Sequence, residues 1–337
     1  MRRKTLYIAI LFWLLPILIT AQDRLPIIDM HLHASRLADF EYLAGPAPIP
    51  HCVPMTDYPV PESGNNWVEI FRSRDLPCHT TWSPETDEQV MTRSFEIMEQ
   101  RNIYGVTSGP MLARWKEASP ERIIQSLSFQ GGPDAPTADE LRGLLEEGEF
   151  AVLGEVTIQY GGIEPNDPSL EPYWSLLEEL DIPVGIHIGT GPVGAPYLGF
   201  GNYRARLHSS LLLEEVLVRH PGLRIYIMHA GWPMIDDLLA ILWTHPQVYI
   251  DIGVINWALP REEFHYYLKR IVGAGFGNRV MFGSDQMVWP ETIEIAIESI
   301  ETADFLTDEQ KRDIFFNNAA RFLRLTDEQI TAMHGER

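Results

Sequence analysis

Eight short β-rich runs alternate with helical stretches along this sequence, and this alternation constrains the fold more than any other feature. Strands that alternate with helices form a parallel sheet, and eight such units in about 300 residues favour closure into a barrel. A doubly wound open sheet is the competing fold, but no glycine-rich phosphate turn follows the first run. The sequence therefore predicts an α/β fold, a (β/α)8 TIM barrel. The predicted strands are 26–34, 103–108, 123–129, 151–159, 183–189, 224–230, 248–254 and 279–285.

Two segments are longer than a simple connection between a strand and a helix. Residues 35–85 are rich in proline and follow the first strand, and residues 190–207 follow the fifth. Loops of this length in a compact domain are functional lids or are disordered. We therefore predict an insertion at 35–85 that forms a lid, within a barrel domain over 22–325. Residues 326–337 are expected to be a frayed C-terminal tail. The helices expected between strands include 86–101, 138–147, 169–180, 209–220 and 262–272, with one or two more in 304–325.

The first 21 residues have the layout of a secretory signal peptide. Arg2, Arg3 and Lys4 precede an almost wholly apolar run over 6–19, which ends in small residues at Ala21. The alternative is a membrane anchor, but the run is short for a transmembrane helix and contains a proline. We expect residues 1–21 to be removed and the mature protein to be secreted or periplasmic. In such an oxidising compartment Cys52 and Cys78 could form a disulfide, and two separate thiols remain the alternative.

The net charge limits the partners of the chain. The formal charge is −21, from 47 acidic and 26 basic side chains. Nucleic acids and anionic membranes need clustered lysine and arginine, so we expect neither as a partner once the signal peptide is removed. The acidic side chains are spread over the sequence, which is typical of solvated helix faces. A small molecule is the expected partner, and a homodimer is the default expectation for assembly.

Histidines and acids stand at the carboxyl ends of the predicted strands. In a barrel these ends surround one opening, so residues far apart in the sequence converge there. Imidazole and carboxylate groups are the ligands of zinc and similar ions, and catalytic sites keep one position open. A single strand histidine is more often packed or capping, but this many at strand ends favours a metal site. The residues are His31 and His33 on the first strand, Glu155 on the fourth, His187 on the fifth, His229 on the sixth and Asp285 on the eighth.

The alternation of side chains along a strand predicts which residues face the opening. It places Asp29, His31 and His33 on one face and turns Met30 and Leu32 outward against helices. It also turns three glycines inward, where they would leave space for a substrate: Gly185, Gly189 and Gly283. The remaining histidines lie in predicted loops or helices, and most are expected at the surface: His51, His79, His208, His220, His245 and His265.

The strand-end motifs resemble those of the amidohydrolase superfamily, and most closely the branch that includes aminocarboxymuconate semialdehyde decarboxylase. The resemblance covers essentially all of the mature chain and is specific for the superfamily but not for a substrate. The matching segments are Ile28–His33 (IDMHLH), Val184–Gly189 (VGIHIG), Tyr226–Gly231 (YIMHAG), Met281–Asp285 (MFGSD) and Asn317–Leu323 (NNAARFL).

This resemblance implies a ligand set and a division of roles. His31, His33, His187 and Asp285 resemble the ligands of a single divalent ion, expected to be zinc. His229 resembles the catalytic histidine after strand six, and Asp285 would also act as the base. Glu155 resembles a glutamate that bridges two metal ions in other branches of the superfamily. Its alternative role is a buried acid paired with an arginine or held in a hydrogen-bond network.

Two enzymatic functions follow from these roles, with a third, non-enzymatic one less favoured. The first is hydrolysis of an ester, lactone or amide bond of a small molecule, in which the ion lowers the pKa of water towards about 7. The alternative is non-oxidative decarboxylation of a small carboxylic acid. The predicted signal peptide and a second metal ion at Glu155 would both favour hydrolysis. A metal-binding barrel without catalysis is the third interpretation, against which the intact ligands argue.

Candidate substrate contacts lie in loops beside the predicted opening. Arg204 and Arg206 could bind a carboxylate or phosphate through the planar guanidinium fork, although surface ion pairs are their alternative role. Tyr203 lies in the same loop. Trp232 follows the sixth strand and Trp289 the eighth, where either could form a wall of the pocket or pack on the barrel rim.

Overall fold

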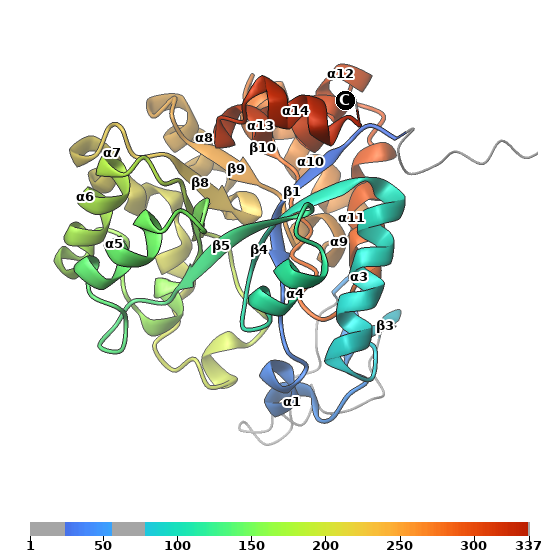
Figure 1. The fold of residues 1–337 in the computed structure, drawn as a ribbon. Helices are drawn as coiled ribbons and strands as arrows, with labels where there is room; N and C mark the ends of the chain where they lie inside the picture. The colour runs from blue at the N-terminus through green and yellow to red at the C-terminus, as the bar shows by residue number, and fades with distance from the viewer. Residues whose placement is uncertain (1–23, 56–77, 336–337) are drawn as a thin grey trace, which may run out of the picture.

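The computed structural model describes residues 24–55 and 78–335. Eight parallel strands follow one another around a barrel in chain order, with helices on the outside (Figure 1), which confirms the predicted fold. All eight predicted strands are present, most of them one to four residues shorter than expected. They are β1 (Ile27–His33), β4 (Ile103–Ser108), β5 (Ile123–Phe129), β6 (Val152–Val156), β7 (Val184–His187), β8 (Ile225–Met228), β9 (Tyr249–Asp251) and β10 (Val280–Met281).

Helices connect the strands and begin where the sequence provides a cap. Thr86 precedes α3 and accepts a hydrogen bond from the backbone of Gln89, and Thr137 and Glu140 form a capping box at α5. The predicted helix 209–220 is helical only in part, because 3₁₀ turns precede α7. The main outer helices are α3 (Asp87–Arg101), α4 (Leu112–Ala118), α5 (Ala138–Glu146), α6 (Glu171–Glu179), α7 (Glu214–Arg219), α8 (Ile235–Thr244), α10 (Arg261–Gly273) and α11 (Glu291–Glu301).

The barrel is nearly closed between its first and last strands. The backbone N–H of Met30 donates to Phe282 O at 2.9 Å, and the N–H of Asp285 donates to His31 O at 2.7 Å. Apolar side chains from non-adjacent strands pack together, which is possible only in the barrel interior. This interior cluster includes Ile28, Met30, Val106, Val152, Tyr226, Met228 and Met281.

A bulge in β1 changes the predicted alternation of side chains. Asp29 pairs with Gly105 and Leu32 with Thr107, so Met30 and His31 both lie opposite one residue of β4. The prediction that Met30 packs outward was therefore wrong, because Met30 belongs to the interior cluster. Leu32 packs in the core between strands and helices as expected. Beyond the bulge the rings of His31 and His33 lie 5.0 Å apart.

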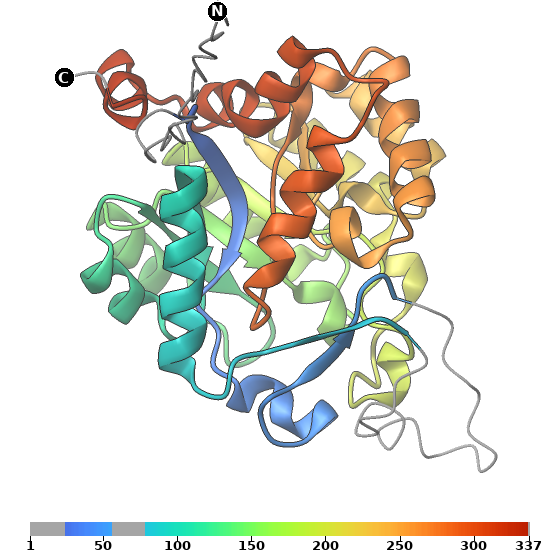
Figure 2. The ribbon, with the colours of Figure 1, turned by 90° about the vertical axis from the view of Figure 1, so that its right-hand side faces the viewer.

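The two ends of the barrel are covered by different parts of the chain (Figure 2). The C-terminal helices lie across the end where the strands begin, and the described part of the insertion lies at the opposite end. The C-terminal helices are α12 (Asp308–Arg312), α13 (Asn318–Leu323) and α14 (Asp327–Met333). The prediction of a frayed tail was wrong over 327–333: Thr326 and Gln329 form a capping box, and Ile330 packs against the interior cluster.

The described part of the insertion contains α1 (Ala38–Ala44) and an antiparallel hairpin of β2 (Pro50–Cys52) and β3 (Thr80–Trp82). The hairpin is fixed to the barrel because the indole N–H of Trp289 donates to Ile49 O at 2.9 Å. A disulfide joins Cys52 to Cys78. Residues 56–77 and the predicted signal peptide lie outside the described residues, so the lid and the signal peptide stay predictions. Within the described residues, every helix is too short or too polar to cross a bilayer.

We expect the disulfide to stabilise the fold measurably. It links residues 26 positions apart, and closing a loop of this length lowers the entropy of the unfolded chain, which stabilises the fold by up to about 3.5 kcal/mol at 25 °C. The variant Cys78→Ser should therefore unfold at lower denaturant concentration than the oxidised protein. Reducing the wild type should give the same shift. Equal midpoints for the oxidised and reduced wild-type protein would contradict this prediction.

Candidate metal centre

The strand ends bring six of the predicted side chains into one cluster. His229 and Asp285 have left-handed backbone conformations, with φ of 60° and 51°. Such values are uncommon for residues other than glycine and occur where the surroundings hold a side chain in a functional position. The cluster contains His31 and His33 of β1, Glu155 of β6, His187 of β7, His229 after β8 and Asp285 after β10.

One half of the cluster contains His31, His33 and Asp285. Asp285 Oδ1 lies 3.0 Å from His33 Nε2 and 3.7 Å from His31 Nε2. Two ligand atoms that each lie about 2.1 Å from one tetrahedral ion are separated by about 3.4 Å. The spacing of these three donor atoms is therefore suited to one divalent ion.

The other half contains Glu155, His187 and His229. Glu155 Oε1 lies 2.5 Å from His187 Nδ1 and 3.4 Å from His229 Nε2. The second carboxylate oxygen, Oε2, lies 3.8 Å from His31 Nε2 and 3.7 Å from His33 Nε2. Glu155 therefore faces both halves of the cluster. Three of the four expected ligands lie in the first half, and the fourth, His187, lies in the second half beside Glu155. Among the described residues, the ion-pair partners of Glu155 are histidines and include no arginine.

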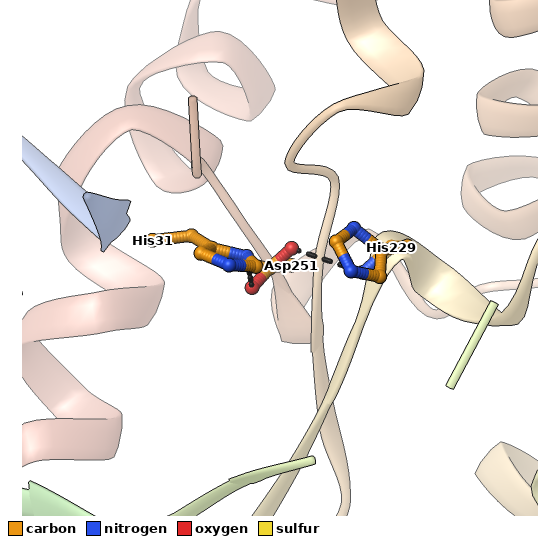
Figure 3. Close-up of side chains that lie close together, drawn as sticks. All are labelled: His31, His229 and Asp251. Carbon is orange, nitrogen blue, oxygen red and sulfur yellow. Dashed lines mark hydrogen bonds and ion pairs between the residues drawn. The ribbon is translucent and has the colours of Figure 1, made fainter. Parts of the chain in front are cut away.

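Asp251 at the end of β9 also belongs to the cluster, and the sequence prediction missed it. Its carboxylate lies between His31 and His229 (Figure 3), with Oδ2 at 3.2 Å from His31 Nδ1. The predicted strand continued to residue 254, which placed Asp251 in the middle of a strand instead of at its carboxyl end. A shorter strand would have identified it as another acid at the opening.

The ionised carboxylates of the cluster favour a bound cation. Burial opposes the charge of His31, but the carboxylates of Asp285 and Asp251 outweigh it and raise the pKa of His31 well above its ordinary value. Burial also opposes ionisation of Glu155, but His187 and other nearby imidazoles outweigh it and hold the pKa of Glu155 well below its ordinary value. Asp285 behaves similarly, because His31 and His33 lower its pKa despite burial. Ionised carboxylates are thus concentrated in a buried site.

The imidazoles have free donor positions that fit a divalent ion. His31 Nε2, which faces Asp285 and Glu155, is buried and has no hydrogen-bond partner among the described residues, whereas the nitrogen of His187 that faces Glu155 and His229 is Nδ1. Leaving such a buried polar atom unsatisfied costs about 1–3 kcal/mol, which metal coordination would offset. The donor set of imidazole nitrogens and carboxylate oxygens is also the one that zinc and its neighbours favour. The residues present therefore fit a divalent ion.

The comparison with known families agrees with this site. The sequence profile of the family described as Amidohydrolase matches residues 28–325. The chain belongs to the amidohydrolase family. As a member it is a metal-dependent enzyme, which confirms the resemblance seen in the strand-end motifs and the expectation of an enzyme.

Relatives of this amidohydrolase include both decarboxylases and a hydrolase. A gamma-resorcylate decarboxylase of Rhodococcus jostii (strain RHA1) is 27% identical over 237 residues, which are 57% of this chain and 68% of the relative. A dihydroxybenzoic acid decarboxylase of Polaromonas sp. JS666, solved with manganese and 2-nitroresorcinol, has a TM-score of 0.56 and 16% identity, covering 90% of this chain and 99% of that one. A probable 2-pyrone-4,6-dicarboxylic acid hydrolase of Acinetobacter baumannii, solved with citric acid, has a TM-score of 0.55 and 15% identity, covering 89% and 100%. The structural likenesses show the fold.

These relatives do not confirm hydrolysis as the reaction of this amidohydrolase. The curated relative is a decarboxylase, so the comparison favours the alternative over the first expectation. The zinc expectation is also not confirmed, since one structural neighbour holds manganese.

The predicted substrate contacts are only partly near the cluster of this amidohydrolase. Arg206 is exposed and pairs with Glu164 at 3.3 Å, and Arg204 donates to the backbone oxygens of Gly201 and Tyr203. Neither arginine is brought to the metal ligands. The two tryptophans have rim contacts: Trp232 Nε1 donates to Glu263 at 3.1 Å, and Trp289 holds the insertion hairpin.

The wall beside His187 contains a buried histidine that was expected at the surface. His208 is fully buried, and its ring centroid lies 4.7 Å from that of Tyr203 and 5.3 Å from that of His187. Burial, together with the charges of His187 and His229, lowers the pKa of His208 to about 2. The surface prediction was also wrong for His220 and His245, which are buried. His208 lies in a 3₁₀ turn, and His220 and His245 each follow the last residue of a helix, where the sequence carries no periodic signal of burial.

The inward glycines make room for neighbouring side chains of the protein and not for a substrate. A Cβ on Gly185 would clash with the ring of Tyr226, and one on Gly189 would lie 2.8 Å from His229 Cβ. A Cβ on Gly283 would lie 2.9 Å from His31 Cβ. The expectation that these glycines leave open space was wrong, because neighbouring side chains fill it. They allow the site histidines to approach the barrel wall.

Proposed function

We propose that this amidohydrolase decarboxylates a small carboxylic acid without oxidation. The observation that supports the proposal is the 27% identity to a gamma-resorcylate decarboxylase over 237 residues, which makes a hydroxybenzoate the first substrate class to test. The cluster of histidines and acids at the carboxyl ends of the strands supplies groups that this reaction needs. In a decarboxylation the carboxyl carbon leaves as carbon dioxide, and a proton takes its place on the remaining carbon.

The metal would be held by His31, His33 and Asp285, with His187 completing the set. A divalent ion bound there supplies positive charge that holds the oxygens of the substrate and stabilises negative charge as the bond breaks. We propose zinc or manganese. His31 and His33 lie on one strand and keep their rings 5.0 Å apart, so this strand fixes two ligands rigidly.

The proton for the product carbon would come from the protonated imidazole of His229, or from Asp285 after this carboxylate has taken a proton from water. His229 Nδ1 lies 3.0 Å from the carbonyl oxygen of Gly253, a contact that orients the ring and leaves Nε2 towards the cluster. Asp285 Oδ2 lies 3.8 Å from His229 Nδ1. The electron pair of the broken carbon–carbon bond accepts this proton, so the reaction needs no oxidant or reductant. A positioned proton donor of this kind contributes about 10²–10⁴-fold to a rate.

Hydrolysis of an ester, lactone or amide is the second candidate, and the position of Glu155 favours it. The carboxylate faces both halves of the cluster, with 2.5 Å to His187 Nδ1 and 3.7 Å to His33 Nε2. A carboxylate placed in this way could hold two ions, and paired ions are typical of hydrolytic sites.

The product decides between the two reactions. Gamma-resorcylate and other small acids labelled with ¹³C at the carboxyl group would be incubated with the metal-loaded enzyme, and labelled carbon dioxide measured. Esters and lactones would be followed in parallel by proton release, and amides by the amine that forms. We expect carbon dioxide in the first assay. Turnover of an ester or lactone with no carbon dioxide from any acid would refute decarboxylation and favour the second candidate.

The variant Glu155→Gln provides an independent prediction. If one ion at His31, His33 and Asp285 carries the reaction, this variant should keep about one metal ion per chain and at least a tenth of the wild-type rate. If a carboxylate must hold a second ion, metal content and rate should fall together, the rate by about 10²-fold or more. Metal analysis and the assay of the active substrate measure both quantities, and the second result would contradict the proposed single-ion decarboxylase.

We also propose that the enzyme works outside the cytoplasm. The disulfide between Cys52 and Cys78 supports this part of the proposal, because disulfides persist in oxidising compartments. Fractionation of cells that express the full chain would test it, and recovery of the whole protein in the cytoplasm with residues 1–21 intact would contradict it.

A further inference from the structure

The two carboxylate oxygens of Asp251 contact different parts of the cluster. It is fully buried at the end of β9. Its Oδ1 accepts two backbone hydrogen bonds, from the N–H of Gly253 at 2.8 Å and from the N–H of His229 at 3.1 Å. The first contact fixes the turn after β9, and the second fixes the residue that carries the candidate catalytic imidazole. One oxygen of Asp251 therefore holds backbone on two adjacent strands.

The other oxygen of Asp251 faces the imidazole of His31. Oδ2 lies 3.2 Å from His31 Nδ1, which is an ion-pair distance, and neither atom has a hydrogen-bond partner among the described residues. The opposite ring nitrogen, Nε2, faces Asp285 and Glu155 at 3.7 and 3.8 Å. Asp251 therefore lies beside the ring nitrogen of His31 that does not face Asp285 and Glu155, and so on the side away from the candidate ion.

Two glycines keep this contact close. A Cβ on Gly253 would lie 3.0 Å from His31 Nδ1 and 3.2 Å from Asp251 Oδ1. A Cβ on Gly283 would lie 2.9 Å from His31 Cβ and 3.3 Å from Asp251 Cγ. Any larger residue at either position would push the ring and the carboxylate apart. The backbone around the pair is thus built for direct contact between them.

We infer that Asp251 is a positioning residue that fixes the tautomer of His31 and the place of His229. A carboxylate has only acceptors, so it requires a hydrogen on His31 Nδ1 and thereby leaves the lone pair of Nε2 free for a metal ion. The same residue anchors the backbone of His229 through its other oxygen. Asp251 thus joins the metal ligand and the candidate catalytic histidine without touching the ion. The inference rests on the metal site of the proposed function and not on which reaction occurs there.

The variant Asp251→Asn separates the two contacts. The amide oxygen can still accept the backbone hydrogen bonds from His229 and Gly253, but the amide N–H₂ then faces His31 Nδ1 and favours the wrong tautomer. Partners of metal-bound histidines typically contribute 10- to 100-fold to metal affinity. We therefore expect metal-stripped Asp251→Asn to bind zinc about 10- to 100-fold more weakly than wild type in a calorimetric titration with zinc chloride.

Asp29→Asn is the matched control. Asp29 is also a fully buried aspartate whose Oδ1 accepts two backbone hydrogen bonds, from His31 at 3.0 Å and Ser284 at 2.9 Å. Its other oxygen, Oδ2, has no hydrogen-bond partner among the described residues, and no ion pair joins its carboxylate to an imidazole there. We expect its zinc affinity to fall by no more than about threefold. Equal weakening in both variants would overturn the inference, since general damage to a buried acid would then explain the loss. Unchanged affinity in Asp251→Asn would also overturn it.

A measurement on the wild type keeps the inference testable if either variant fails to fold. In the zinc-loaded protein, ¹⁵N-resolved NMR of the His31 ring should show hydrogen on Nδ1 and none on Nε2. Hydrogen on Nε2 would overturn the inference. If the wild type binds no zinc and no manganese, the proposed function fails and this result is distinguishable, because it is seen before any variant is compared.

Discussion

Replacing Asp285 with Asn should reduce turnover by about 10³-fold or more while the fold is kept. Asp285 Oδ1 lies 3.0 Å from His33 Nε2, and its pKa is lowered by the surrounding imidazoles despite burial. An amide of the same shape can neither exchange a proton nor place a negative charge on the ion, and proton transfer alone contributes about 10²–10⁴-fold. Asparagine adopts the left-handed backbone that residue 285 requires, φ 51°, so the turn should survive.

The rate would be measured with the substrate that the product assays identify, beside the exposed variant Asp236→Asn as a control. Asp236 pairs with Arg270 at the surface at 3.0 Å, so its loss should leave both rate and metal content unchanged. Melting curves and circular dichroism of Asp285→Asn should match those of the metal-stripped wild type. A variant that folds and keeps more than a tenth of the wild-type rate would exclude Asp285 from the mechanism.

The barrel could be predicted because its signal is carried by local periodicity. Each β-rich run is bounded by a helical stretch, so the order and the type of the elements follow from neighbouring residues. The bulge in β1 could not be predicted, because it depends on which residues of β4 lie opposite Met30 and His31. A shift of one residue in register moves side chains between faces. The helix α14 was missed for a related reason, since its packing partners lie far away in the sequence.

The positions of the candidate metal ligands could be predicted more accurately than those of the substrate contacts. His31, His33, Glu155, His229 and Asp285 stand at strand ends, and the barrel topology alone brings such positions together. The distances that place His187 beside Glu155 depend on side-chain rotation, which the sequence does not encode locally. Arg204 and Arg206 were selected for their chemistry, but loop conformation decides where they point, and Arg206 reaches Glu164.

Removal of the metal should abolish activity and lower the melting temperature by about 5–10 °C. A ligand present at about 1,000 times its dissociation constant stabilises a protein by about 4 kcal/mol. Each kcal/mol raises the melting temperature of a protein of this size by about 2 °C. The cluster explains why the effect should be large, since buried Asp285 and the adjacent carboxylate of Glu155 would both lose the positive charge of the ion. Dialysis against a chelator, then calorimetry and assay before and after addition of zinc or manganese, would measure it. Restored activity should accompany restored stability.

The stabilisation by metal should also grow with pH, because protons compete with the ion for His31. In the metal-free fold the pKa of His31 is raised above its ordinary value of 6.5, so its protonated form stabilises the fold at low pH. This contribution is lost as the pH rises through the raised pKa, and the metal-free protein becomes less stable there. The metal-bound protein has no such proton on His31 Nε2, and binding becomes tighter as the imidazoles lose their protons. The difference in melting temperature between the two forms should therefore widen as the pH rises above 6.5 and through the raised pKa of His31. A difference that narrows over this range would show that the imidazoles are not the ligands, even if the protein binds a metal ion elsewhere.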